Sequence, residues 1–159
     1  MRYTTELLKA IGEINAENKD IVDIINTHIG NVEYYHDIGK DYEGITVAEI
    51  VEKEDHPDAD KLGVYKIYVG DETRIQVVAG DKTLEIGDKV AYIKPGATVP
   101  ISVYEDEPIV IKEVKLRGVD SNGMLGSEKE LNLGSNHENV MRLPVDAIPG
   151  TPFADFYSF

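Results

Sequence analysis

The sequence predicts a mainly β domain, built as a small barrel or sandwich, with a short helical segment before it. Short apolar runs with a period of two recur from about Ile45 to Leu116, and Gly or Pro separates them. Helical periodicity is confined to brief pieces, chiefly near the amino terminus. A chain of 159 residues can bury roughly two-thirds of its unfolded surface, which is enough for one such domain and a small appendage.

The amino-terminal segment carries two runs of helical spacing. The first contains Leu7, Leu8, Ile11 and Ile14, and the second contains Ile21, Ile24, Ile25 and His28. Gly30 follows at a position suited to a left-handed helix cap, and residues 31–37 are expected to form a short strand. Residues 1–43 are therefore predicted to be a helix–helix–strand appendage, with a packing role favoured over a partner-binding one.

Five strands are predicted in the remainder of the chain. They cover Ile45–Glu52, Tyr65–Val69, Ile75–Ala79, Val90–Ile93 and Ile109–Leu116. The last is expected to be half-buried and to lead into a turn at Ser121–Gly123, because Gly accepts positive φ and Ser and Asn bond nearby amides. Ser127 and Glu130 have the spacing of a capping box, which predicts a helical turn beginning at Ser127.

The segment around this turn combines three kinds of chemistry. Lys112, Lys115 and Arg117 supply cations, Ser121, Asn122 and Ser127 supply neutral hydrogen-bonding groups, and Met124 supplies an exposed apolar surface. Single-stranded nucleic acid is bound by such a mixture of phosphate, base-edge and base-face contacts. On residue types alone, the favoured alternative is a strand end, a turn and a Met–Leu pair anchored in the core.

Composition and charge exclude several classes of function. The net charge of −14 argues against non-specific binding to nucleic acid, DNA included, although residues 61–129 are nearly neutral at −1. No run approaches the roughly 20 apolar residues that a membrane span needs, and the chain begins without a secretory signal. No Cys is present, and we find neither a catalytic constellation nor a nucleotide-binding loop. A cytoplasmic protein without catalytic residues is expected.

The segment His56–Lys61 brings one imidazole and two carboxylates close together in sequence. A zinc site needs three or four ligands at suitable spacing, whereas Pro57 and the Asp side chains favour a turn. The sequence therefore predicts a turn here and no metal site. His137 is likewise interpreted as a loop residue.

Two motifs resemble a known family. Arg117–Leu125 resembles the Arg-Gly-Val-x-Ser-x-Gly-Met-Leu signature of the tRNA-binding OB domain of synthetase-associated proteins, and Asp55–Leu62 resembles its His-Pro-x-Ala-Asp-Lys-Leu element. Further segments between Gln76 and Phe153 are most similar to the version near the amino end of bacterial phenylalanyl-tRNA synthetase β subunits. The resemblance implies a tRNA-binding OB-fold domain over residues 44–159. Its five-stranded barrel is expected from about Ile45 to about Leu143, with both motifs on connections and residues 149–159 along the surface.

The resemblance also implies a tRNA-binding module. The expected RNA contacts are Lys115, Arg117, Ser121, Asn122, Met124, Ser127, Lys129, Lys61 and Lys94. The expected partners are tRNA, bound weakly and locally, the synthetase α subunit and the remaining β domains. ATP and Mg²⁺ are expected only in the full synthetase, so the fragment alone has no cofactor. The alternatives are a free-standing tRNA-binding or chaperone protein and an assembly adaptor that uses the OB face. The acidic run Glu105–Glu107 would repel phosphate at close range, which argues against tight autonomous tRNA binding and favours a domain embedded in a large synthetase.

Overall fold

The computed structural model describes residue 9 and residues 16–157. The chain divides into two compact units, Met1–Asp37 and Ile38–Phe159, whereas the sequence placed the boundary between residues 43 and 44. The difference arises at the short 3-10 helix η1 (Ile38–Tyr42), whose last residue belongs to the core of the second unit.

The first unit contains one of the two predicted helices, α2 (Asn18–His28), while the other lies outside the described residues. The helix ends at the C-cap residue Ile29, whose φ is −120°, and Gly30 does not have a positive φ. The amides of Ile29 and Gly30 both donate to the carbonyl of Ile25. The predicted cap at Gly30 is therefore wrong. Residues 31–37 form no strand, because the chain after the helix bonds to a helix side chain: the amide of Val32 donates to Oδ1 of Asn26 at 2.7 Å.

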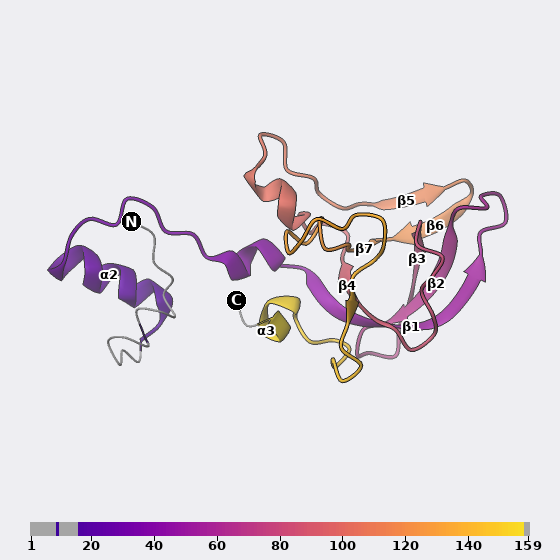
Figure 1. Cartoon of the computed structure of the whole chain (residues 1–159), viewed down its shortest axis with the longest axis horizontal. Coiled ribbons are helices and arrows are strands. Elements are labelled where there is room, and N and C mark those ends of the chain that lie inside the picture. Colours follow the sequence, from indigo (N-terminus) through magenta and orange to yellow (C-terminus); the bar gives the residue numbers. More distant parts are fainter. Residues whose placement is uncertain (1–8, 10–15, 158–159) are drawn as a thin grey trace. The chain divides into compact units, whose positions relative to one another are not determined.

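The second unit is an antiparallel sheet coiled into a barrel (Figure 1). Its strands are β1 (Ile45–Asp55), β2 (Gly63–Tyr68), β3 (Arg74–Ala79), β4 (Lys89–Ile93), β7 (Met124–Leu125) and β8 (Arg142–Leu143). The order is β3-β2-β1-β4-β7, and β8 also pairs with β4. The first four strands confirm the predicted ones, and all four segments contain the β-branched residues that strands favour.

The long strand β1 belongs to both halves of the barrel. Its first part pairs with β4, and its later part pairs with β2. A register shift between Ile50 and Glu52 lets the strand bend, as a bulge does, and Figure 1 shows its curved course. Val47 and Ile50 are fully buried in two neighbouring core clusters, where each aliphatic side chain stabilises the fold by about 1.5–3 kcal/mol.

The segment that the sequence assigned to a strand and a turn is instead a hairpin. Strands β5 (Glu113–Leu116) and β6 (Val119–Asn122) pair with each other, and Arg117 and Gly118 form the two-residue loop. Both loop residues have positive φ, 45° and 87°, as a type I′ turn requires. The predicted turn at Ser121–Gly123 is therefore wrong, and β5 is exposed rather than half-buried.

Side chains fasten this hairpin to the barrel. The amide of Val78 on β3 donates to Oγ of Ser121 at 3.0 Å, and Nε2 of Gln76 donates to the carbonyl of Asp120 at 2.8 Å. These bonds stand where a backbone ladder would close the sheet, so the barrel is nearly closed. The result is an OB-like barrel, as predicted.

The carboxy-terminal segment does more than lie on the surface. The short helix α3 (Phe153–Tyr157) places the ring of Phe153, which is fully buried, 5.5 Å from the ring of Tyr42. The hydroxyl of Tyr42 donates to the carbonyl of Leu131 at 2.8 Å. The expectation that residues 149–159 only follow the surface is thus wrong at Phe153. Among the described residues, no helix is long and apolar enough to cross a membrane.

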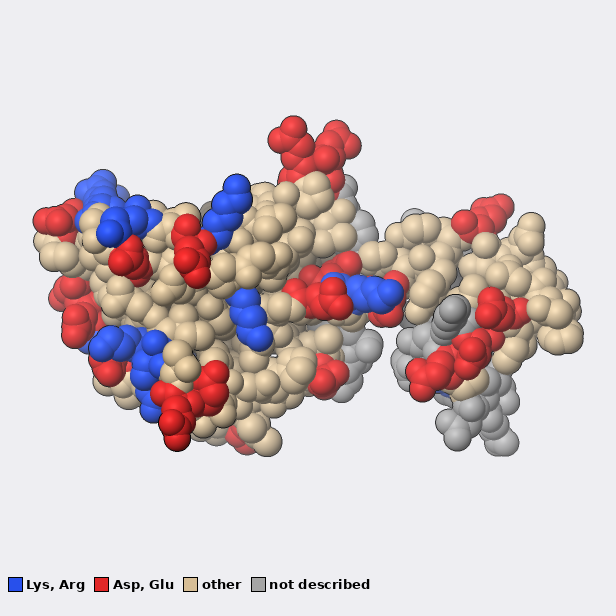
Figure 2. All heavy atoms as spheres, turned by 180° about the vertical axis from the view of Figure 1, so that it is seen from behind, with Lys and Arg blue, Asp and Glu red and all other residues tan. Residues whose placement is uncertain are grey.

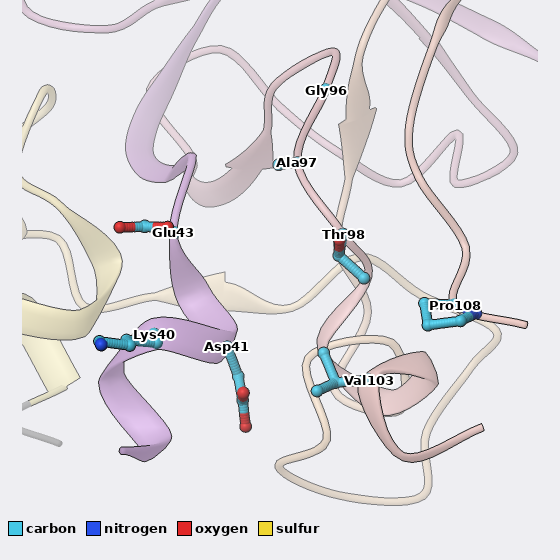
Figure 3. Close-up of a pocket in the computed structure, with 8 residues that line it drawn as sticks. All are labelled: Lys40, Asp41, Glu43, Gly96, Ala97, Thr98, Val103 and Pro108. Carbon is cyan, nitrogen blue, oxygen red and sulfur yellow. The ribbon is translucent and has the colours of Figure 1, made fainter. Parts of the chain in front are cut away.

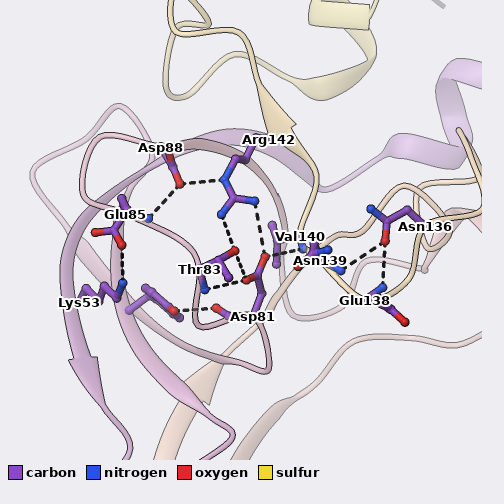
Figure 4. Close-up of polar contacts among 11 residues, drawn as sticks. Lys53, Asp81, Thr83, Glu85, Asp88, Asn136, Glu138, Asn139, Val140 and Arg142 are labelled. Carbon is purple, nitrogen blue, oxygen red and sulfur yellow. Dashed lines mark hydrogen bonds and ion pairs between the residues drawn. The ribbon is translucent and has the colours of Figure 1, made fainter.

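A buried carboxylate joins the loop after β3 to the chain before β8 (Figure 4). Oδ1 of Asp81 accepts from the amide and hydroxyl of Thr83 at 2.8 and 2.6 Å, and Oδ2 accepts from the amide of Val140 at 3.0 Å. Burial raises the pKa of Asp81, but these hydrogen bonds and the nearby Arg142 guanidinium outweigh burial and leave that pKa below its usual value. The carboxylate therefore stabilises the fold in its charged form.

This contact predicts a pH-dependent stability. Asp81→Asn should lower the free energy of unfolding at pH 7 by at least about 2 kcal/mol, because an amide cannot accept all three bonds. The folded pKa is depressed, so the contribution is complete above the unfolded value near 4 and is lost as the pH falls through the folded pKa. Urea unfolding of the wild type and of Asp81→Asn at pH 7 and pH 3 measures the difference in their free energies of unfolding, which should be smaller at pH 3. A difference that stays constant would contradict this role of Asp81.

Candidate nucleic-acid interface

The two sequence motifs meet at one end of the barrel. The first forms the loop between β1 and β2, and the second begins at the tip of the β5–β6 hairpin. Nε2 of His56 lies 2.9 Å from the carbonyl oxygen of Leu116, and Nη1 of Arg117 donates to the carbonyl of Asp58 at 3.1 Å. We call this reciprocal pair of bonds the clasp. Segments about 60 residues apart in sequence thereby form one surface.

The loop that contains His56 is closed by its own backbone. The amide of His56 donates to the carbonyl of Leu62 at 3.2 Å, and the amide of Leu62 donates to Ala59 at 2.9 Å. The imidazole is buried, and its Nδ1 accepts from the amide of Asp58 at 3.1 Å. The predicted turn is thus confirmed, and both ring nitrogens are engaged. Within the described residues, no group of His, Asp and Glu could hold a metal ion.

Three of the predicted contact residues lie at this end. Lys61 is exposed on the loop, Arg117 is exposed at the hairpin tip, and Lys115 is exposed on β5, with Nζ 3.3 Å from Asp120. We call these three side chains the tip cations. The pair of Lys115 with Asp120 is open to solvent, so it holds the lysine only weakly.

A fourth cation at this end was missed from the sequence. Nζ of Lys82 donates to the carbonyl of Asp60 at 3.1 Å and lies 2.6 Å from Oδ1 of Asp55. The Lys82 hydrogen bond and charge lower the pKa of Asp55. Lys82 is therefore partly neutralised and braces the loop. No local signal predicts this contact, because Lys82 stands more than twenty residues away in sequence.

The polar residues of the second motif face inward. Ser121 is only 1% exposed, and its Oγ accepts from Val78 and lies 3.3 Å from the carbonyl of Gly123. The carbonyl of Asn122 accepts from the Tyr92 hydroxyl at 2.7 Å, and burial, with nearby Glu113, raises the pKa of Tyr92 to about 12, which keeps that donor protonated. Ser121 is thus inaccessible to RNA, and Asn122 is half-buried.

Gly123 follows these residues at a position that only glycine suits. Its φ is 103°, and an added Cβ would stand 2.5 Å from the Tyr92 ring and 2.6 Å from the carbonyl oxygen of Ile93. The glycine of the signature therefore permits close packing of the chain against β4.

The remaining predicted contacts are distributed differently. Met124 is half-buried against the core and not exposed as expected, while Ser127 is 3% exposed. Ser127 and Glu130 form the predicted capping box, with the Ser127 amide and hydroxyl each 2.7 Å from Oε2 of Glu130. Lys94 and Lys129 are exposed, but they lie toward the start of β1, at its opposite end. Lys94 follows Ile93, which pairs with Ile45, and Lys129 stands two residues before Leu131, whose carbonyl accepts from Tyr42. The structure does not bring these two cations to the tip.

On the face drawn in Figure 2, Lys and Arg side chains are interspersed with Asp and Glu and form no continuous stripe. A pocket of about 330 Å³ lies between η1 and the chain after β4. It is lined by Lys40, Asp41, Glu43, Gly96, Ala97, Thr98, Val103 and Pro108. In Figure 3, Lys40 and Glu43 point away from Thr98 and Val103, so the lysine of this pocket does not converge with the Thr98 side chain.

The fold and this surface together indicate an oligonucleotide-binding protein. An OB-like barrel with polar and cationic connections at one end is typical of that class of protein. Comparison with known proteins agrees with that class. The profile of the family described as "Putative tRNA binding domain" matches residues 45–152, and the chain belongs to this family.

Several curated relatives are phenylalanine–tRNA ligase β subunits. The phenylalanine–tRNA ligase β subunit of Bacteroides thetaiotaomicron is 35% identical over 135 residues, which cover 84% of this chain and 16% of that protein. The β subunit of Pseudomonas fluorescens is 42% identical over 118 residues, which cover 74% and 14%. The chain thus spans less than a fifth of the length of these relatives.

A solved structure supports the fold. The MetRS related protein from Pyrococcus horikoshii superposes with a TM-score of 0.51 and 17% sequence identity, covering 74% of this chain and 96% of that one. At this identity the similarity concerns the barrel alone.

The burial of Ser121 leads to a prediction that distinguishes a structural role of this residue from a direct contact with RNA. Ser121→Ala should lower the free energy of unfolding by about 1–3 kcal/mol, because the Val78 amide loses its acceptor inside the barrel. Affinity for tRNA, measured well below the melting temperature, should stay unchanged. Ser135→Ala, at an exposed loop position, is the matched control and should change neither quantity. A loss of affinity without a loss of stability would show that Ser121 contacts RNA.

Proposed function

We propose that this chain binds tRNA as a module of a phenylalanine–tRNA ligase β subunit. The observation that carries the proposal is the meeting of the two family motifs at one exposed end of the barrel. The family match over residues 45–152 and the similarity to β subunits support it. No observation favours a free-standing binder or an assembly adaptor.

The proposed contact is made by the tip cations Lys61, Lys115 and Arg117. Each can meet one phosphate, and the backbone carbonyls around them suit the hydroxyls of RNA. Asp58, Asp60 and Asp120 lie among them, so the local field is nearly neutral. Binding by this surface should therefore be weak and local, and other parts of a synthetase would supply the remaining affinity.

The proposed setting is the assembled synthetase in the cytoplasm. The α subunit and the remaining β domains are the proposed protein partners. ATP and Mg²⁺ would serve aminoacylation in the whole enzyme, and we propose that this chain binds tRNA without either. The purified chain should accordingly show no phenylalanine-dependent pyrophosphate exchange.

Salt titration tests the proposed contact. Lys61→Ala and Lys115→Ala should each weaken binding of a phenylalanine tRNA transcript and reduce the log–log salt slope by about 0.7, the value for one single-strand phosphate. Lys129→Ala removes an exposed lysine toward the other end of β1 and is the matched control. Fluorescence anisotropy with labelled tRNA at several salt concentrations measures both quantities.

Two results would count against this assignment. A wild-type chain that fails to bind tRNA at low salt would remove the proposed function. Equal effects of Lys129→Ala and Lys61→Ala would remove the tip as the contact surface while leaving tRNA binding intact.

A further inference from the structure

The side chain of His56 connects two segments with two different ring atoms. The amide of Asp58 can only donate, so Nδ1 must accept at 3.1 Å. The carbonyl of Leu116 can only accept, so Nε2 must donate at 2.9 Å. The two contacts together select the neutral imidazole with its proton on Nε2. With 5% exposure, the ring has little water to replace either partner.

The two ring contacts have different effects. The bond at Nδ1 is local, since it shapes the turn two residues further along the loop. The bond at Nε2 reaches across to the hairpin, directly before the residue Arg117. Arg117 returns the contact to the carbonyl of Asp58, but it does so at an exposed position where water competes. The buried half of the clasp is therefore the stronger constraint on the hairpin tip.

The hairpin needs such a constraint. Strand β5 is exposed along its whole length, and in the described part of the chain its sheet partner is β6. The bonds from Gln76 and Val78 hold β6 near its middle, at Asp120 and Ser121, and leave the two-residue tip to the clasp. Without the bond from His56, the hairpin tip would depend for its place beside this loop on the exposed bond from Arg117 to Asp58.

We propose that His56 is a positioning residue for RNA binding. Through the Leu116 carbonyl it sets the distance between the tip cations of the loop and those of the hairpin, so that they meet the phosphates of one strand together. This inference rests on the proposed tRNA binding of the same surface. His56 itself, being buried, does not touch the RNA.

Two isosteres separate the contacts of the ring. In His56→Gln the side-chain amide nitrogen takes the place of Nε2 and can still donate to Leu116. In His56→Asn the side-chain oxygen takes the place of Nδ1 and can still accept from Asp58 in an Asx turn. Each variant keeps one bond and loses the other, so they form a matched pair.

The expected result is a difference between these variants in tRNA affinity. His56→Asn should weaken binding at low salt by at least about twofold, and His56→Gln should bind like the wild type. Adding Arg117→Ala should cost less affinity in the His56→Asn background than in the wild type, because the tip is already misplaced. Lys129→Ala should cost the same in both backgrounds.

A second measurement does not involve RNA. Amide hydrogen exchange at residues 116–119 should be faster in His56→Asn than in the wild type, and His56→Gln should restore the protection. A nitrogen–proton correlation spectrum of the imidazole should show the proton on Nε2 in the wild type. Thermal unfolding of each variant identifies any loss of global stability.

The outcomes separate this inference from the function on which it rests. If both variants bind tRNA like the wild type, or lose affinity only in proportion to lost stability, His56 is scaffold and the proposal is overturned. If the wild type binds no tRNA, the proposed function fails, and the exchange data still decide whether His56 fixes the hairpin. Unchanged exchange in His56→Asn would overturn the positioning role by itself.

Discussion

The arrangement of the tip depends on how the barrel closes between β3 and β6. A backbone ladder is replaced there by two bonds from side chains, one from Gln76 and one to Ser121. The buried amide of Val78 must have an acceptor, and a hydroxyl on β6 provides it at 3.0 Å. This closure holds the base of the hairpin, the hairpin presents Arg117, and Arg117 meets the loop that follows β1. A serine hydroxyl inside the barrel thus helps to hold the base of the hairpin against β3.

Much of the fold could be predicted because local preference and burial agree along β1 to β4. The register after Ile109 could not be predicted in the same way. Ser121–Gly123 has the composition of a turn, yet Ser121 and Asn122 are paired in β6. The true turn uses Arg117 at a φ of 45°, a conformation that its residue type does not signal. Contacts of the hairpin with the barrel determine that the turn lies at Arg117 and Gly118 rather than at Ser121–Gly123. A local sequence pattern does not contain those contacts.

The candidate site shows a similar division. The sequence placed both motifs on connections. The structure confirms this for the loop that contains Lys61, whereas the second motif runs through β6 and β7, and Arg117 and Gly118 form its exposed turn. The sequence could not separate the polar residues that face solvent from those that form hydrogen bonds with buried backbone groups. A small hydroxyl suits either position, as Ser121 and Ser127 show with exposures of 1% and 3%. The meeting of His56 with Leu116 was likewise invisible, since it depends on the path of the chain through three strands.

The acidic run Glu105–Glu107 lies in the exposed loop after η2 (Pro100–Tyr104), and the chain then leads through β5 to the hairpin tip. Its three carboxylates and the tip cations therefore occupy separate regions of the same unit. A polyanion approaching this unit meets repulsion at one region and a nearly neutral field at the other. Electrostatic repulsion of a nucleic acid is therefore weaker at the tip than at the acidic loop, which favours approach of the phosphates to the tip. Orientation of the encounter, and its sensitivity to ionic strength, thus follow from a loop that need not touch the nucleic acid.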